Sequence, residues 1–150
     1  AKEHQLERVI TIFPWIAIID KFQHWIYEHP VHTHEERTAT WNEILKEFQD
    51  NVIDYSGLET YRSNNWQRQL HLFEVPFYYI EYGIAQLGAI GMWMQYKENK
   101  EQAMDNYCKA LALGGTRTLP QLFETAGLKF DFSPDKIKVL MEFVKEEMER

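Results

Sequence analysis

The sequence predicts an all-α protein, and three observations lead to that expectation. Apolar residues recur at spacings of three and four along most of the 150 residues, as in helices with one buried face. Residues that commonly begin or end helices flank these segments. No long segment shows the alternation of apolar and polar residues that is typical of a half-buried strand. We therefore expect a bundle of about six to eight helices.

The amino-terminal part contains two expected helical segments. Residues 3–12 form the first, and Pro14 breaks or kinks it because a proline inside a helix has no N–H to donate. Pro14 can serve as the first residue of the next helix, which covers residues 15–28 and ends at His29 and Pro30. One face of this helix is apolar: Ile18, Ile19, Phe22, Trp25 and Ile26.

A third helix is expected from Thr33 to about Asn51. Thr33 and Glu36 have the T-x-x-E spacing of a capping box, in which each side chain bonds the other residue's backbone N–H. Residues 52–65 lose the helical period and gain Asp, Ser, Gly and Asn, so they predict a loop with at most a short helical turn.

The most apolar and aromatic stretch follows this loop. A short helix over residues 66–73 leads to Pro76, which suits the first turn of a long helix reaching about Glu98. On that helix, Tyr79, Tyr82 and Gln86 share one face. Small residues on it allow close approach of other helices: Gly83, Ala85, Gly88, Ala89 and Gly91.

The last third predicts three further helices. Asn99 caps one that Gly114 and Gly115 end, a brief one covers residues 118–127, and Ser133 begins the last. The segment LKFDF between the last two (residues 128–132) is the one candidate for a short strand.

Composition indicates one packed domain over residues 1–150. Apolar residues make up 45% of the chain and charged residues 26%, which argues against disorder. The formal charge of −7, with no basic stripe, argues against nucleic acid as a partner. The amino terminus lacks the layout of a signal peptide and begins within a helical pattern, so we expect a piece of a longer chain.

A membrane-spanning segment is not expected. The only candidate covers residues 77–94, and Glu81 within it would cost roughly 2.5–3.5 kcal/mol at the centre of a bilayer. The single cysteine, Cys108, excludes an internal disulfide framework and is compatible with a reducing compartment. We therefore expect a cytoplasmic protein.

One cluster of possible metal ligands lies at residues 29–36. Its three imidazoles and two carboxylates are ligand types that zinc accepts: His29, His32, His34, Glu35 and Glu36. Capping already explains Glu36, so we favour a turn over a metal site. The residues HEERT at positions 34–38 also fail the H-E-x-x-H pattern of zinc peptidases, because Thr38 stands where the second His is required.

His71, Tyr79 and Tyr82 are the candidates for chemistry. A phenol at the edge of a cleft can donate a hydrogen bond to a carbonyl oxygen on which negative charge develops. Taken one by one, these residue types are more often ordinary core or interface residues. The residues alone leave both interpretations open.

Two segments resemble the carboxy-terminal part of oligoendopeptidase F and its relatives, the thimet-oligopeptidase-like zinc peptidases. They are RQLHLFEVPFYYIEYGIAQLGAI and LFETAGLKFDFSPDKIKVLMEFV, and the resemblance extends from about Thr11 to the end of the chain. It implies a helical, clam-shell-like peptidase that hydrolyses short peptides with zinc. The H-E-x-x-H ligands would lie upstream, so the resemblance implies a carboxy-terminal fragment that binds no zinc and is inactive alone.

The resemblance also implies roles for the candidate residues. Tyr82 is the first choice to donate to the scissile carbonyl oxygen, with Tyr79 beside it and His71 holding the substrate backbone or the intermediate. Tyr78 leaves open which phenol takes which role. The expected partners are a short peptide substrate and the upstream part of the same domain, and the exposed apolar surface of a fragment would favour self-association.

Two other functions remain open at this stage. One is a non-catalytic helical module that binds a peptide or protein on an aromatic cleft. The other is a stand-alone enzyme that uses the cluster at residues 29–36.

Overall fold

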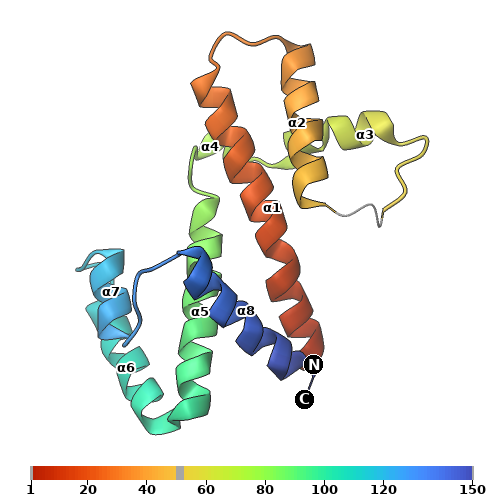
Figure 1. Cartoon of the computed structure of the whole chain (residues 1–150). Coiled ribbons are helices and arrows are strands. Elements are labelled where there is room, and N and C mark those ends of the chain that lie inside the picture. The colour runs from red at the N-terminus through yellow and green to blue at the C-terminus, as the bar shows by residue number, and fades with distance from the viewer. Residues whose placement is uncertain (1, 50–52, 150) are drawn as a thin grey trace. The chain divides into compact units, whose positions relative to one another are not determined.

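Helices account for all the regular secondary structure that the structure describes. The computed structural model describes residues 2–49 and 53–149, and no strand occurs within them (Figure 1). The elements are α1 (Lys2–Glu28), α2 (His34–Phe48), α3 (Glu59–Ser63), the 3₁₀ helix η1 (Asn65–Arg68), α4 (His71–Glu74), α5 (Ile80–Glu98), α6 (Lys100–Leu113), α7 (Leu119–Thr125) and α8 (Pro134–Met148). The predicted all-α class is confirmed.

The chain divides into two compact units. The first unit covers residues 7–83, and the second covers residues 1–6 together with 84–150. Each unit is described by itself below. The expectation of a single helical unit over residues 1–150 stays a prediction.

The first unit has an aromatic core around α1 and α2, which run antiparallel beside each other (Figure 1). The ring of Phe22 lies 4.9 Å from that of Trp41 and 5.6 Å from that of Trp66. The Trp41 indole N–H donates to the backbone oxygen of Arg62 at 2.9 Å, which attaches α3 to α2. The buried residues of this core are Ile18, Ile19, Phe22, Trp41, Ile44, Leu45, Trp66 and Leu72.

The predicted break at Pro14 is wrong, because α1 continues through it as one helix. A proline inside a helix costs about 3 kcal/mol. Full burial of an aliphatic side chain contributes about 1.5–3 kcal/mol, and Ile16, Ile18 and Ile19 are all buried in the turns just after Pro14. Burial of this face therefore outweighs the lost hydrogen bond.

The beginning of α2 is confirmed in detail. The Glu36 backbone N–H donates to the Thr33 hydroxyl at 3.1 Å, and the Thr33 N–H donates to the Glu36 carboxylate at 2.7 Å. This backbone hydrogen bond lowers the pKa of the Glu36 carboxyl below its ordinary value. The helix ends at Phe48, and the predicted end at Asn51 lies outside the described residues.

Two predicted boundaries around the aromatic stretch are wrong. The single helix expected over residues 66–73 is two short ones, because η1 and α4 are separated at Gln69 and Leu70. The long helix begins at Ile80, four residues after Pro76. Phe77 has a φ of 60°, a left-handed conformation that a helix cannot contain.

Small residues of α5 allow close approach, as the sequence predicts. In the second unit, a Cβ added to Gly88 would lie 2.9 Å from the Phe123 ring, and one added to Gly91 would lie 3.0 Å from the Leu128 side chain. Trp93 meets Phe143 of α8 edge to face at 4.9 Å. α5 is thus held against α7 and α8 by aromatic and aliphatic contacts.

The short strand expected at residues 128–132 is absent, and these residues have no regular secondary structure. Phe130 and Phe132 pack edge to face on each other at 4.7 Å, and Phe123 lies 5.1 Å from Phe130. The apolar residues of LKFDF therefore form an aromatic cluster in the second unit instead of pairing with another strand. No described helix is both long enough and apolar enough to cross a membrane.

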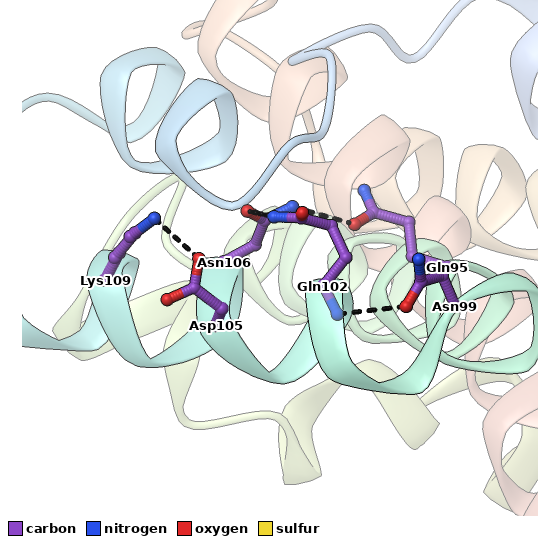
Figure 2. A network of polar contacts seen from close by, with 6 residues as sticks. All are labelled: Gln95, Asn99, Gln102, Asp105, Asn106 and Lys109. Atoms are coloured by element: carbon purple, nitrogen blue, oxygen red, sulfur yellow. Dashed lines mark hydrogen bonds and ion pairs between the residues drawn. The ribbon is translucent and has the colours of Figure 1, made fainter.

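Polar side chains join α5 to α6 (Figure 2), and one of them also bonds the turn after α7. Gln102 donates to Asn106 at 2.9 Å, Asn106 contacts Gln95 at 3.5 Å, and Gln95 donates to the backbone oxygen of Gly127 at 2.7 Å. The Asn99 side chain caps α6 by accepting from the Gln102 backbone N–H. This network surrounds Gly127, whose φ is 73°.

We expect Gly127→Ala to lower the free energy of unfolding by about 1–3 kcal/mol, because left-handed backbone alone costs an alanine about 1–2 kcal/mol. The added Cβ would also lie 2.7 Å from the Asn106 amide nitrogen. Urea unfolding of the chain measures the change. Gly114→Ala separates the two causes, since Gly114 has a φ of 53° but no neighbour within 4 Å. Gly115→Ala meets neither problem, so equal losses in all three variants would contradict the account.

Candidate active site

His71, Tyr79 and Tyr82 lie together in the first unit. The His71 Nε2 atom is 3.1 Å from the Tyr82 hydroxyl oxygen. The ring centroids are 4.9 Å apart for His71 and Tyr79, 5.6 Å for His71 and Tyr82, and 5.2 Å for the two tyrosines. The three candidates from the sequence thus form one cluster, which we call the His–Tyr cluster, and their catalytic roles stay predictions.

Tyr78 lies at the edge of the same cluster. Its ring stacks on His71 at 6.3 Å and meets Tyr82 edge to face at 5.8 Å. The side chain is 49% exposed, compared with 40% for Tyr82. Tyr78 and Tyr82 therefore both remain accessible to a ligand, while Tyr79 packs partly against the core of the unit.

A strained turn before α5 places the tyrosines. Tyr79 lies in this turn and not on the helix, so the predicted shared helical face of Tyr79 and Tyr82 is wrong. The Phe77 backbone N–H donates to the Gln23 side-chain oxygen at 2.8 Å. The Phe77 ring also packs against His24 at 5.0 Å and Tyr27 at 4.9 Å. Three successive contacts from α1 hold Phe77 in its left-handed conformation.

Gln23 was not singled out from the sequence, although a signal exists. It occupies a position of the apolar stripe of α1 beside Ile19, Phe22 and Ile26, and it is only 2% exposed. Buried amides in native proteins are nearly always hydrogen-bonded. A glutamine within an apolar stripe therefore indicates a specific partner elsewhere in the chain, here Phe77.

Gln23→Leu is expected to lower the free energy of unfolding by about 1–3 kcal/mol, because it leaves the Phe77 N–H without its partner. The leucine fills a similar volume, so loss of packing does not dominate. Thermal or urea unfolding of the chain tests this. Gln67→Leu is the matched control, since Gln67 is exposed, and an equal effect of both variants would exclude the proposed cause.

A chain of hydrogen bonds connects the His–Tyr cluster with α1. The Trp15 indole N–H donates to the Gln69 side-chain oxygen at 3.1 Å. The Gln69 amide nitrogen lies 2.6 Å from His71 Nδ1, and His71 Nε2 contacts Tyr82 as described. Neither Trp15 nor Gln69 was predicted as a site residue, because Gln69 lies 54 positions from Trp15 in the sequence.

Tyr79 keeps its proton at neutral pH. Burial raises the pKa of the Tyr79 hydroxyl above its ordinary value, and the nearby Trp15 indole opposes that shift only in part. A neutral phenol can donate a hydrogen bond. Tyr79 is therefore available as a donor over the physiological range.

The histidines at residues 29–36 serve the turn between α1 and α2. His29 Nδ1 bonds the Trp25 backbone oxygen at 2.9 Å, and the His29 ring stacks on Trp25 at 4.9 Å. His32 contacts the His29 backbone oxygen through Nδ1 and accepts from Arg37 Nε through Nε2 at 2.7 Å. Both ring nitrogens of His32 are thus occupied.

A zinc ion does not fit the described residues. Within residues 2–49 and 53–149, no three side chains of His, Cys, Asp or Glu are grouped so that they could hold a metal ion. Structural and catalytic zinc sites both use at least three such protein ligands. The part of the chain that the structure describes therefore offers no metal centre.

The segment around the His–Tyr cluster exposes many large apolar side chains. Those within residues 70–82 are all at least 36% exposed: Leu70, Phe73, Val75, Phe77, Tyr78, Ile80 and Tyr82. Proteins rarely leave such a contiguous apolar segment uncovered. We call residues 70–82 the exposed aromatic segment.

Comparisons with known proteins point to one family. The model of Peptidase family M3 matches residues 1–141. The oligoendopeptidase F homolog of Borreliella burgdorferi is 26% identical over 118 residues, which are 75% of this chain and 19% of that protein. These matches confirm the resemblance found in the sequence.

Solved structures of peptidases are also similar to this chain. An X-ray structure of an oligoendopeptidase F has a TM-score of 0.84 and 31% identity, and PZ peptidase A with an inhibitor has a TM-score of 0.84 and 29% identity. Both matches cover 98% of this chain and 26% of the other chain. The chain thus spans about a quarter of the solved structures that it matches.

Proposed function

The chain belongs to peptidase family M3, and we propose that it forms the carboxy-terminal part of the catalytic domain of a zinc endopeptidase that hydrolyses short peptides. In this proposal it contributes the residues that bind the substrate and stabilise the oxyanion. The observation that carries the proposal is the 3.1 Å contact between His71 and Tyr82 within the His–Tyr cluster. A zinc site with H-E-x-x-H would lie upstream of the matched stretch, so no step is assigned to a metal here.

Tyr82 is the residue we assign to the scissile carbonyl. Tyr82 is 40% exposed, so a ligand can reach its side chain, and its ring is held between those of His71, Tyr78 and Tyr79. As the carbonyl oxygen gains negative charge, a donor fixed in place lowers the barrier by roughly 3–4 kcal/mol. Tyr79 and His71 bind the peptide backbone or the intermediate beside it.

The exposed aromatic segment supports the proposed partner, the upstream part of the same domain. That part would cover the apolar side chains of residues 70–82 and complete the substrate channel. The same uncovered surface supports self-association of the isolated chain. The isolated chain is expected to be inactive, and a cytoplasmic location stays a prediction.

A non-catalytic helical module is the second candidate. Its support is the same exposed aromatic surface, which a peptide or protein could occupy without chemistry. The two candidate functions differ in one respect: whether the His–Tyr cluster takes part in peptide hydrolysis once the upstream part of the domain and zinc are present.

Mixing the chain with the upstream part of the domain and zinc distinguishes the two. Cleavage of a short fluorogenic peptide by the mixture, but by neither part alone, supports the peptidase. A mixture containing the Tyr82→Phe variant is the control and should cleave much more slowly. A well-folded complex without any cleavage would favour the binding module.

A further inference from the structure

We propose that Gln69 is a positioning residue that sets the direction of the hydrogen-bond chain from Trp15 to Tyr82. In doing so it leaves the Tyr82 hydroxyl hydrogen free for a substrate carbonyl. This inference rests on the proposed function, because it explains how one member of the His–Tyr cluster becomes a donor. It adds two residues, Trp15 and Gln69, to which no role was assigned above.

The direction is set at Trp15. An indole N–H can only donate a hydrogen bond, and it points at the Gln69 side chain at 3.1 Å. Only the oxygen of that amide can accept. The amide nitrogen of Gln69 must therefore face the other way, toward His71.

The next bond follows from the first. An amide NH₂ group can only donate, and it lies 2.6 Å from His71 Nδ1. Nδ1 must then be the nitrogen without a hydrogen. In the neutral ring the hydrogen is on Nε2, because a neutral imidazole carries one hydrogen on one of its two nitrogens.

The last bond determines what Tyr82 can do. His71 Nε2–H donates to the Tyr82 oxygen at 3.1 Å. The Tyr82 hydroxyl hydrogen is then not used within the cluster and can donate to a ligand. With the other His71 tautomer, Nε2 would accept that hydrogen, and Tyr82 would present only lone pairs to a carbonyl oxygen.

The first donor is fixed by the core. Trp15 meets Trp41 edge to face at 5.8 Å, and Trp41 is fully buried. The Gln69 backbone N–H donates to the Trp66 oxygen at 3.0 Å, so the backbone of Gln69 is held as well. The direction of the chain thus originates in an indole that packs against the core of the first unit.

The tautomer of His71 is the direct test. Nitrogen NMR of the ¹⁵N-labelled chain, recorded where histidine rings carry one proton, distinguishes a protonated from an unprotonated ring nitrogen. The signals of His71 are those that disappear in His71→Gln. We expect an unprotonated Nδ1 and a protonated Nε2, and a protonated Nδ1 in the wild-type chain would overturn the inference.

Gln69→Glu reverses the direction with almost no change in shape. A carboxylate still accepts from Trp15 but can no longer donate to His71, so in a ring that carries one proton this proton should move to Nδ1. In the complete enzyme, at a pH where the nitrogen NMR signals show one proton on the ring in both proteins, kcat should fall roughly tenfold or more while KM changes by less than about threefold. Gln67→Glu makes the same change of charge two residues earlier, on an exposed side chain. This control should neither move the His71 ring proton nor lower kcat.

The outcomes separate this inference from the proposed function. A full rate in Tyr82→Phe would remove the proposed function and the inference together. A slow Tyr82→Phe combined with a Gln69→Glu variant that behaves like Gln67→Glu would overturn the role of Gln69 alone. The wild-type NMR result requires only that His71→Gln folds well enough to assign the signals, and it does not depend on the activity of any variant.

Discussion

Tyr82→Phe is expected to lower kcat of the complete enzyme by roughly 10- to 1,000-fold, as removal of one oxyanion donor does in other hydrolases. The variant keeps the ring that packs between His71, Tyr78 and Tyr79. It removes only the hydroxyl that we assign to the carbonyl oxygen. Zinc content and the unfolding curve should therefore stay unchanged.

Tyr107→Phe is the matched control, because Tyr107 is 45% exposed, compared with 40% for Tyr82, and lies in the second unit. It should have the wild-type kcat. Tyr78→Phe and Tyr79→Phe, measured beside Tyr82→Phe, show which phenol contributes most. If Tyr78→Phe were the slow variant and Tyr82→Phe the fast one, the assignment would move to Tyr78.

His71→Phe is expected to lower kcat roughly 10- to 100-fold, the usual range for one catalytic hydrogen-bonding group. Phenylalanine keeps a ring beside Tyr79 and Tyr82 but removes both nitrogens. Tyr82 then loses the partner that lies 3.1 Å from its oxygen, and the Gln69 amide loses its acceptor. The steady-state rate on a short fluorogenic peptide measures the effect.

His34→Phe serves as the control for His71→Phe. His34 is exposed at the start of α2 and contacts the Thr38 hydroxyl on the same helix at 3.2 Å. The His34→Phe variant also tests the hypothesis that the histidines at residues 29–36 are catalytic. Equal losses in the two variants would contradict the assignment to His71.

Helix ends with a side-chain cap were the best predicted part of the fold, because capping depends on residues close in sequence. The Thr33 and Glu36 box, the Asn99 cap and the Ser133 cap all occur as the sequence indicates. The left-handed Gly114 after α6 also follows from its residue type. A capping residue and the backbone N–H that it binds are only three residues apart, so the sequence alone identifies the pair.

The errors have a common cause in distant contacts. Pro14 stays within α1 because the apolar residues after it are buried, and α5 begins late because Gln23, 54 positions away, binds the Phe77 N–H. Residues 128–132 form no strand because the rings of Phe130 and Phe132 pack with Phe123. None of these partners can be identified from local spacing.

In the candidate site, too, some residues could be predicted from the sequence and others could not. His71, Tyr79 and Tyr82 were singled out by residue type and position, the family resemblance implied their roles, and the structure brings them together. Trp15 and Gln69 were missed, because their bond links residues 54 positions apart. Glutamine and tryptophan are also too common in cores and loops for their type alone to indicate a site.

In the proposed function, Tyr82 stabilises the oxyanion in the transition state. A phosphinic peptide, whose tetrahedral centre carries a negative oxygen, resembles that state and should gain from the same donor. Its inhibition constant for the complete enzyme, in wild type and in Tyr82→Phe, is the most direct measurement. We expect Tyr82→Phe to weaken the binding of the inhibitor by about the same factor as it lowers kcat/KM, with KM of the substrate nearly unchanged. Undiminished binding of the inhibitor to a slow Tyr82→Phe enzyme would contradict it.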